Sequence, residues 1–151
     1  MITVKVKEIV MDQSNNPLLL LADLEGKKIL PLGISFWEAQ SIAVKLKGEV
    51  TPRPLTHDLI GSIIKEMDVE VDRIEIYDVH QDTFYANIFM HYKGTEIVVD
   101  ARPSDAVALA LTVGASIYLS EKVDHYTISS KDLVIGEDED TEGGEGGTRL
   151  H

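Results

Sequence analysis

Two segments far apart in the chain hold side chains suited to chemistry on a phosphate ester. The first runs from Pro52 to Leu59 and the second from Asp100 to Ala110. Hydrolysis of a phosphodiester needs charge stabilisation at the phosphoryl oxygens, an activated water and a proton for the leaving oxygen. The residue types that can supply these are Arg53, His57, Asp58, Asp100, Arg102 and Asp105.

The arginines and the histidine have different predicted roles. Arginine clamps phosphate with its planar fork, so we predict that Arg53 and Arg102 bind phosphate. Histidine exchanges protons near neutral pH, so we predict His57 to be a catalytic acid or base.

The carboxylates add a metal hypothesis. Hard oxygen ligands hold Mg²⁺ or Mn²⁺, and we predict such an ion on Asp58, Asp100 and Asp105. Asp58 and Asp105 are also predicted catalytic residues beside His57. Both aspartates begin helices, whose first turns favour anions. The hypothesis requires these two helix starts to meet across the fold.

A structural explanation competes with each of these roles. Asp105 follows Pro103 in a first helical turn, which is ordinary helix-start chemistry, and Asp58 has a similar position. Arg102 could simply pair with Asp105 and hold the helix to its strand. His57 could be a polar residue of a first turn.

The elements that must position these residues form two similar series. Alternating and apolar runs predict strands over 3–11, 18–21 and 28–32, and a helix that opens with a capping box at Ser35 and Glu38 and ends at Gly48. A shift of 67 residues lays this series on strands over 71–79, 83–91 and 96–100 and a helix ending at Gly114. Glu38 then falls on Asp105, which argues for Asp105 as a cap.

A further helix lies between the two series. Thr56 is its predicted N-cap, and an apolar stripe follows to Met67. The predicted fold is therefore α+β, with two β-β-β-α repeats forming one mixed or antiparallel curled sheet and the helices packed outside.

Composition limits the kinds of site and the classes of protein that remain possible. The 151 residues include no cysteine, which excludes disulfides and zinc–thiolate sites. The alternating N-terminus does not resemble a secretory signal, and no run reaches the roughly 20 apolar residues of a membrane span. We expect a cytoplasmic protein with one domain over residues 1–135 and a disordered acidic tail over 136–151. The net charge of −12 repels phosphate, so nucleic-acid chemistry would need a local cluster or bound cations.

Both motifs, Pro52 to Leu59 and Asp100 to Ala110, resemble the signature segments of the bifunctional nuclease family, and the strand at Asp82 to Ala86 also fits. The resemblance covers roughly Val4 to Ile135. It implies a compact α+β fold, often oligomeric, and a nuclease acting on RNA and DNA, as reported for plant members.

A non-catalytic module is the alternative to this activity. In it the motifs build helix ends and a subunit interface, and the protein binds another protein or an anionic effector. The helix from Asp105 to Val113 is apolar nearly all round, so it must lie between the sheet and a second surface. A partner subunit is one candidate for that surface, and a homodimer is the favoured assembly.

Overall fold

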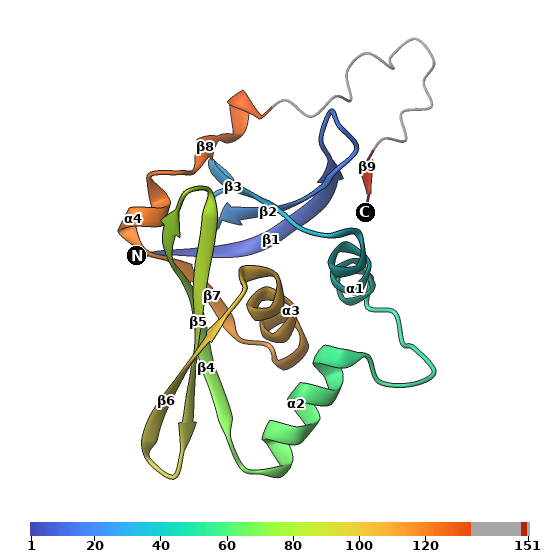
Figure 1. The fold of residues 1–151 in the computed structure, drawn as a ribbon, viewed down its shortest axis with the longest axis vertical. Helices are drawn as coiled ribbons and strands as arrows, with labels where there is room; N and C mark the ends of the chain where they lie inside the picture. Colours follow the sequence, from blue (N-terminus) through green and yellow to red (C-terminus); the bar gives the residue numbers. More distant parts are fainter. Residues whose placement is uncertain (134–148, 151) are drawn as a thin grey trace.

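The first third of the chain forms an antiparallel meander closed by a helix (Figure 1). The computed structural model describes residues 1–133 and 149–150, so the predicted acidic tail lies outside the described residues, except for these last two. The elements of this unit are β1 (Ile2–Met11), β2 (Pro17–Asp23), β3 (Lys28–Gly33) and α1 (Phe36–Lys47).

The second unit repeats this order further along the chain. Its elements are β4 (Glu70–His80), β5 (Thr83–Tyr92), β6 (Thr95–Ala101) and α3 (Pro103–Val113). Helix α2 (Thr56–Glu66) lies between the units and belongs to neither series. The chain continues through β7 (Ser116–Leu119), α4 (Glu121–Asp124), β8 (Ile128–Ser129), a short 3₁₀ turn and β9 (Arg149–Leu150).

The described strands form one open, mixed sheet. Its order is β6-β5-β4-β7-β1-β2-β3-β8, and β9 pairs with the end of β1. The two meanders thus lie on either side of β7, which is antiparallel to β1 and parallel to β4. The α+β class and the two β-β-β-α units predicted from the sequence are confirmed.

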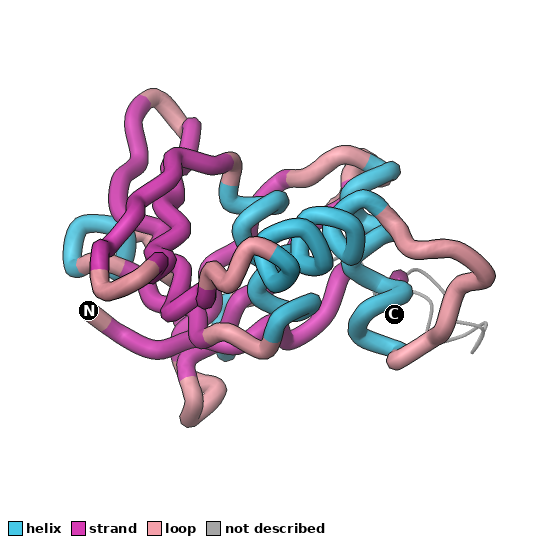
Figure 2. Tube along the Cα trace, turned by 90° about the horizontal axis from the view of Figure 1, so that it is seen from below, coloured by secondary structure: helices cyan, strands magenta, loops and turns pink. Residues whose placement is uncertain are grey.

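The main core lies between this sheet and the helices, which gather beside the strands (Figure 2). Ile9 and Ile76, which the 67-residue shift makes equivalent, are both fully buried there. Helix α3 packs against the sheet on one side and against α1 and α2 on the other. Its all-round apolar character is therefore satisfied within the chain and needs no partner subunit.

A second, smaller apolar cluster covers the opposite face of β1, β2 and β3. Val10, Leu20 and Ile29 are buried there beneath Ile128 and Leu133. The segment after α4 thus covers the outer face of the first meander. None of the helices in the described part of the chain combines the length and apolar character that crossing a membrane requires.

Capping explains where the first two helices begin. In α1 the Ser35 hydroxyl accepts from the Glu38 amide and the Glu38 carboxylate accepts from the Ser35 amide, as predicted. The prediction that Thr56 caps α2 is wrong, because Leu55 occupies the N-cap. Leu55 has no side-chain acceptor, so the Asp58 carboxylate accepts its amide at 2.9 Å.

Gly61 permits the close approach of α2 to α3. A Cβ at this position would lie 3.3 Å from Thr112 Cγ2 and 3.5 Å from Val113 Cγ1. A larger side chain would push α2 away from α3 and from the residues at its N-terminus.

We predict that Gly61→Leu destabilises the protein by about 1–3 kcal/mol, because overpacking outweighs the higher helix propensity of leucine. Urea denaturation measures this difference. Gly33→Leu is the matched control, since a Cβ at Gly33 meets nothing within 4 Å. Equal stability of the Gly61→Leu variant and the parent would show that α2 is not held closely against α3.

Candidate functional site

A cleft of about 650 Å³ opens where the three larger helices meet β5 and β6. Its walls are mainly apolar and come from Ile60, Ile64, Ile88, Met90, Val99 and Leu109. At one end stand four charged or ionisable side chains, Glu38, His57, Arg102 and Asp105. The two sequence motifs therefore meet at this cleft, as the nuclease hypothesis requires.

His57 and Asp105 make the central contact of the site. His57 Nε2 lies 3.1 Å from Asp105 Oδ1, although 48 residues separate them in the chain. The imidazole is 15% exposed, so it is held in place yet open to the cleft. A carboxylate in this position fixes the orientation of the ring. The pair thus has the geometry of a histidine–aspartate acid–base unit.

Arg102 joins this pair to a second carboxylate. Its Nε donates to Asp105 Oδ2 at 2.8 Å, and its Nη1 lies 2.9 Å from Glu38 Oε2. The Ser104 hydroxyl donates to the same Glu38 oxygen at 2.9 Å. Glu38 is thus the residue that sequence reasoning missed. The 67-residue shift contained the signal, because it makes Glu38 the equivalent of Asp105.

The network holds both carboxylates ionised. Burial opposes ionisation of Glu38, but the Ser35 amide, the Ser104 hydroxyl and Arg102 outweigh it and lower its pKa. Burial likewise opposes ionisation of Asp105, whose pKa is lowered by Arg102 and His57. The Arg102 pKa is raised by Asp105 and Glu38. With a neutral imidazole the four side chains carry a net charge of −1.

Asp58 lies outside this network. Its carboxylate forms an ion pair with Lys45 of α1 and accepts the Leu55 amide, and both contacts lower its pKa. It borders a different groove, between α2, α3 and the start of β4. Asp58 therefore caps the start of α2 through the Leu55 amide and links α2 to α1 through Lys45.

Among the described residues, neither Asp100 nor Arg53 forms a hydrogen bond or ion pair with the dyad. Asp100 borders the cleft, but it alternates with the inward Val99 and Ala101, and its charge helps to raise the pKa of Tyr77 on β4, after the larger effect of burial. Arg53 is exposed on the loop before α2, and its side chain forms no hydrogen bond or ion pair with the other described residues.

The carboxylates predicted to bind a metal are therefore not brought together. Asp58 is paired with Lys45, both oxygens of Asp105 are engaged by His57 and Arg102, and strand alternation turns Asp100 away from the inward side of β6. This arrangement does not fit a three-carboxylate site for Mg²⁺ or Mn²⁺, which needs convergent oxygen ligands.

Trp37 is the main aromatic residue of the cleft rim. It is 75% exposed and lines the cleft, with its ring edge-on to that of Phe36. An exposed indole beside an apolar cleft offers a flat surface on which a planar ligand can stack.

We predict a pH-dependent contribution of the Glu38–Arg102–Asp105 network to stability. Since the folded-state pKa values of both acids are lowered, this stability is present above their unfolded values of about 4 and is lost as pH falls through the folded values. Arg102→Gln should lower the unfolding midpoint at neutral pH and flatten its decline below pH 4. Denaturation curves across this range measure both effects, and an unchanged decline would contradict them.

We predict that Asp58→Ala lowers stability by about 1 kcal/mol, the usual cost of losing a helix cap, without altering the cleft. The His57 ring signals in NMR spectra should keep their positions, because Asp58 does not contact that ring. A large shift of those signals would place Asp58 within the dyad after all.

Comparison with known proteins identifies the family of the chain. Residues 19–130 match the family model for the bifunctional nuclease domain. Uncharacterized proteins from two strains of Mycobacterium tuberculosis, CDC 1551 and H37Rv, are each 39% identical over 140 residues, covering 92% of this chain and 81% of their own length. The matched residues include both motifs and every member of the charged network. The chain therefore belongs to the bifunctional nuclease domain family.

Proposed function

We propose that this protein is a nuclease that hydrolyses phosphodiester bonds in RNA and DNA at the His57–Asp105 end of the cleft. The observation that carries the proposal is the 3.1 Å contact between His57 Nε2 and Asp105 Oδ1, formed by the two motifs typical of the family. An oriented imidazole open to a cleft is the arrangement that general acid–base catalysis needs.

In this proposal His57 takes the proton from the attacking water. Asp105 stabilises the resulting imidazolium, and His57 then returns the proton to the leaving oxygen. Arg102 stabilises negative charge on the phosphoryl oxygens. Its side chain is 68% exposed, so it can turn from its carboxylate partners toward a phosphate while remaining attached to α3.

The surroundings of the dyad suit a strand rather than a small anion. A second hollow of about 660 Å³ lies next to the cleft, and Glu38 and Arg102 border both. A phosphodiester placed at Arg102 would thus have space on either side for neighbouring nucleotides. The apolar walls and Trp37 offer stacking surfaces for a base. Arg53 remains the predicted second phosphate contact.

Charge is the main obstacle to binding. The chain carries −12 and the site −1, so phosphate approaches against the field. Divalent cations in solution would reduce this repulsion, and a need for Mg²⁺ or Mn²⁺ remains a prediction. The carboxylate contacts described above support no step that passes through a metal at Asp58, Asp100 and Asp105.

We predict that single-stranded RNA and plasmid DNA are cleaved by the purified chain and that His57→Gln lowers the rate by roughly 10²–10⁴-fold, the usual contribution of general acid–base catalysis. Asp105→Asn should reduce the rate at saturating substrate, because the ring loses its orientation. Cleavage is measured with fluorescently labelled oligonucleotides, with Mg²⁺, with Mn²⁺ and with chelator.

Asp58→Asn is the matched control, since this aspartate is adjacent in sequence but turned away from the dyad. The cleavage rate of this variant should stay within about two-fold of the parent rate, a small change compared with the loss expected for His57→Gln. Unchanged cleavage rates in both His57→Gln and Asp105→Asn would refute this site. A loss of rate in Asp58→Asn as large as that in His57→Gln would show that the reaction does not depend on the dyad alone.

A second function, as a self-associating module, is favoured by the surface of α2. This helix buries none of its residues, and its stripe of Leu59, Ile60, Ile63 and Met67 is exposed. An exposed apolar stripe of this kind is typical of a subunit interface. The occupant proposed here is a second copy of the chain, which would make a dimer.

Light scattering should then give a dimer mass that falls to the monomer mass in Ile63→Lys. Gln40→Lys on exposed α1 is the control for the added charge. A monomer at all concentrations would exclude this module, and it would leave the nuclease proposal untouched.

A further inference from the structure

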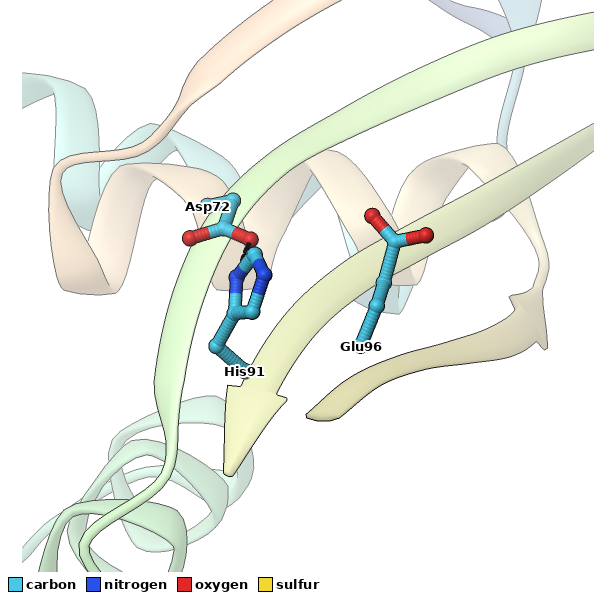
Figure 3. Close-up of side chains that lie close together, drawn as sticks. All are labelled: Asp72, His91 and Glu96. Atoms are coloured by element: carbon cyan, nitrogen blue, oxygen red, sulfur yellow. Dashed lines mark ion pairs between the residues drawn. The ribbon is translucent and has the colours of Figure 1, made fainter. Parts of the chain in front are cut away.

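Three ionisable side chains meet on the second meander, outside the charged network of the cleft. Asp72 of β4, His91 of β5 and Glu96 of β6 each offer one ligand atom, and these atoms lie within 4.8 Å of one another. They come from three adjacent strands and stand side by side (Figure 3). We propose that Asp72, His91 and Glu96 bind one divalent transition-metal ion of the Zn²⁺ or Mn²⁺ class.

The backbone places each of the three ligands. A two-residue turn, with positive φ at both Lys93 and Gly94, joins β5 to β6 and brings His91 directly opposite Glu96. On the other side of β5, the pairing with β4 shifts register between Val71 and Arg73, which leaves Asp72 as the extra residue of a bulge. Bulges redirect a side chain, and this one brings Asp72 into contact with His91.

The contacts within the group are already close to those of a ligand set. His91 Nδ1 forms an ion pair with Asp72 Oδ2, and the two side chains are 44% and 30% exposed. The partial exposure leaves room for the water molecules that complete the coordination of a three-ligand site.

The local charge favours a cation, because the nearby basic groups are directed elsewhere. The Arg73 guanidinium stacks on Phe89 at 3.8 Å and Lys93 lies 5.2 Å from the Tyr92 ring centroid. Among the described residues, Glu96 has no ion-pair partner. A further carboxylate, Glu70, lies directly opposite His91 on β4.

The ligand types select the class of metal. Mg²⁺ and Ca²⁺ prefer oxygen ligands alone, whereas a nitrogen from imidazole with two carboxylates suits Zn²⁺, Mn²⁺ and their neighbours. The group is separate from the cleft, because His91 follows Met90, whose side chain lines the cleft from the inner face. Successive residues of a strand point to opposite faces, so His91 points to the outer face.

The test is metal binding by the full chain after dialysis against chelator. Calorimetry with Zn²⁺ and visible absorption with Co²⁺ should each give one site per chain at neutral pH. His91→Gln and Glu96→Gln should weaken Zn²⁺ binding by at least about ten-fold, since each removes a direct ligand. Mn²⁺ should broaden the His91 ring signals in NMR spectra more than those of His57.

His80→Gln is the matched control, because His80 is exposed at the far end of β4. It should bind Zn²⁺ like the parent chain. A thermal melt tests folding of each variant, and only variants that keep the ligands should gain stability from Zn²⁺. Equal binding by His91→Gln and the parent, or loss of binding in His57→Gln instead, would overturn the proposal. Neither result depends on whether the cleft cleaves nucleic acid.

Discussion

The bridge that Arg102 makes between Glu38 and Asp105 holds the functional end of the molecule together. Each carboxylate occupies the third position of a helix, and the 67-residue repeat makes these positions equivalent. The two carboxylates would repel each other, but each is attracted to the Arg102 guanidinium that bridges them. The starts of α1 and α3 are thereby joined, and Asp105 keeps its second oxygen free for His57.

Local rules were enough to predict most elements, but the meeting of the two motifs was only a requirement of the nuclease hypothesis, and the direction of each side chain was not predicted. His57 and Asp58 are neighbours in the sequence, yet successive helix residues point about 100° apart, so the two side chains have different surroundings. The choice depends on how α2 packs against α3 and on Lys45, which attracts Asp58 to α1. Tertiary contacts of this kind produce no periodic pattern in a single sequence, so the sequence alone does not predict them. The direction of Asp100 likewise depends on strand alternation, which turns it away from Val99.

The cleft arises where the two repeats differ. Leu30 and Leu32 of β3 are buried, whereas their equivalents, Ile97 and Val99 of β6, are only partly covered. The first meander is closed on its outer face by the segment that contains Ile128 and Leu133. At its far edge β3 also pairs with β8, whereas β6 is the edge strand of the described sheet, and its residues 99–101 form one wall of the cleft. An apolar wall next to an ionised network then favours a ligand that is planar at one end and charged at the other.

The histidine comes from the one large helix that the repeat does not contain. The repeat supplies the paired acids Glu38 and Asp105, so at the cleft the duplicated part of the fold provides carboxylates and a guanidinium but no histidine. Helix α2, held close to α3 at Gly61, brings His57 to one of the two acids and leaves the other with Arg102 and Ser104. Equivalent residues therefore acquire different tasks. Asp105 contacts the His57 imidazole, whereas Glu38 caps the start of its own helix, α1.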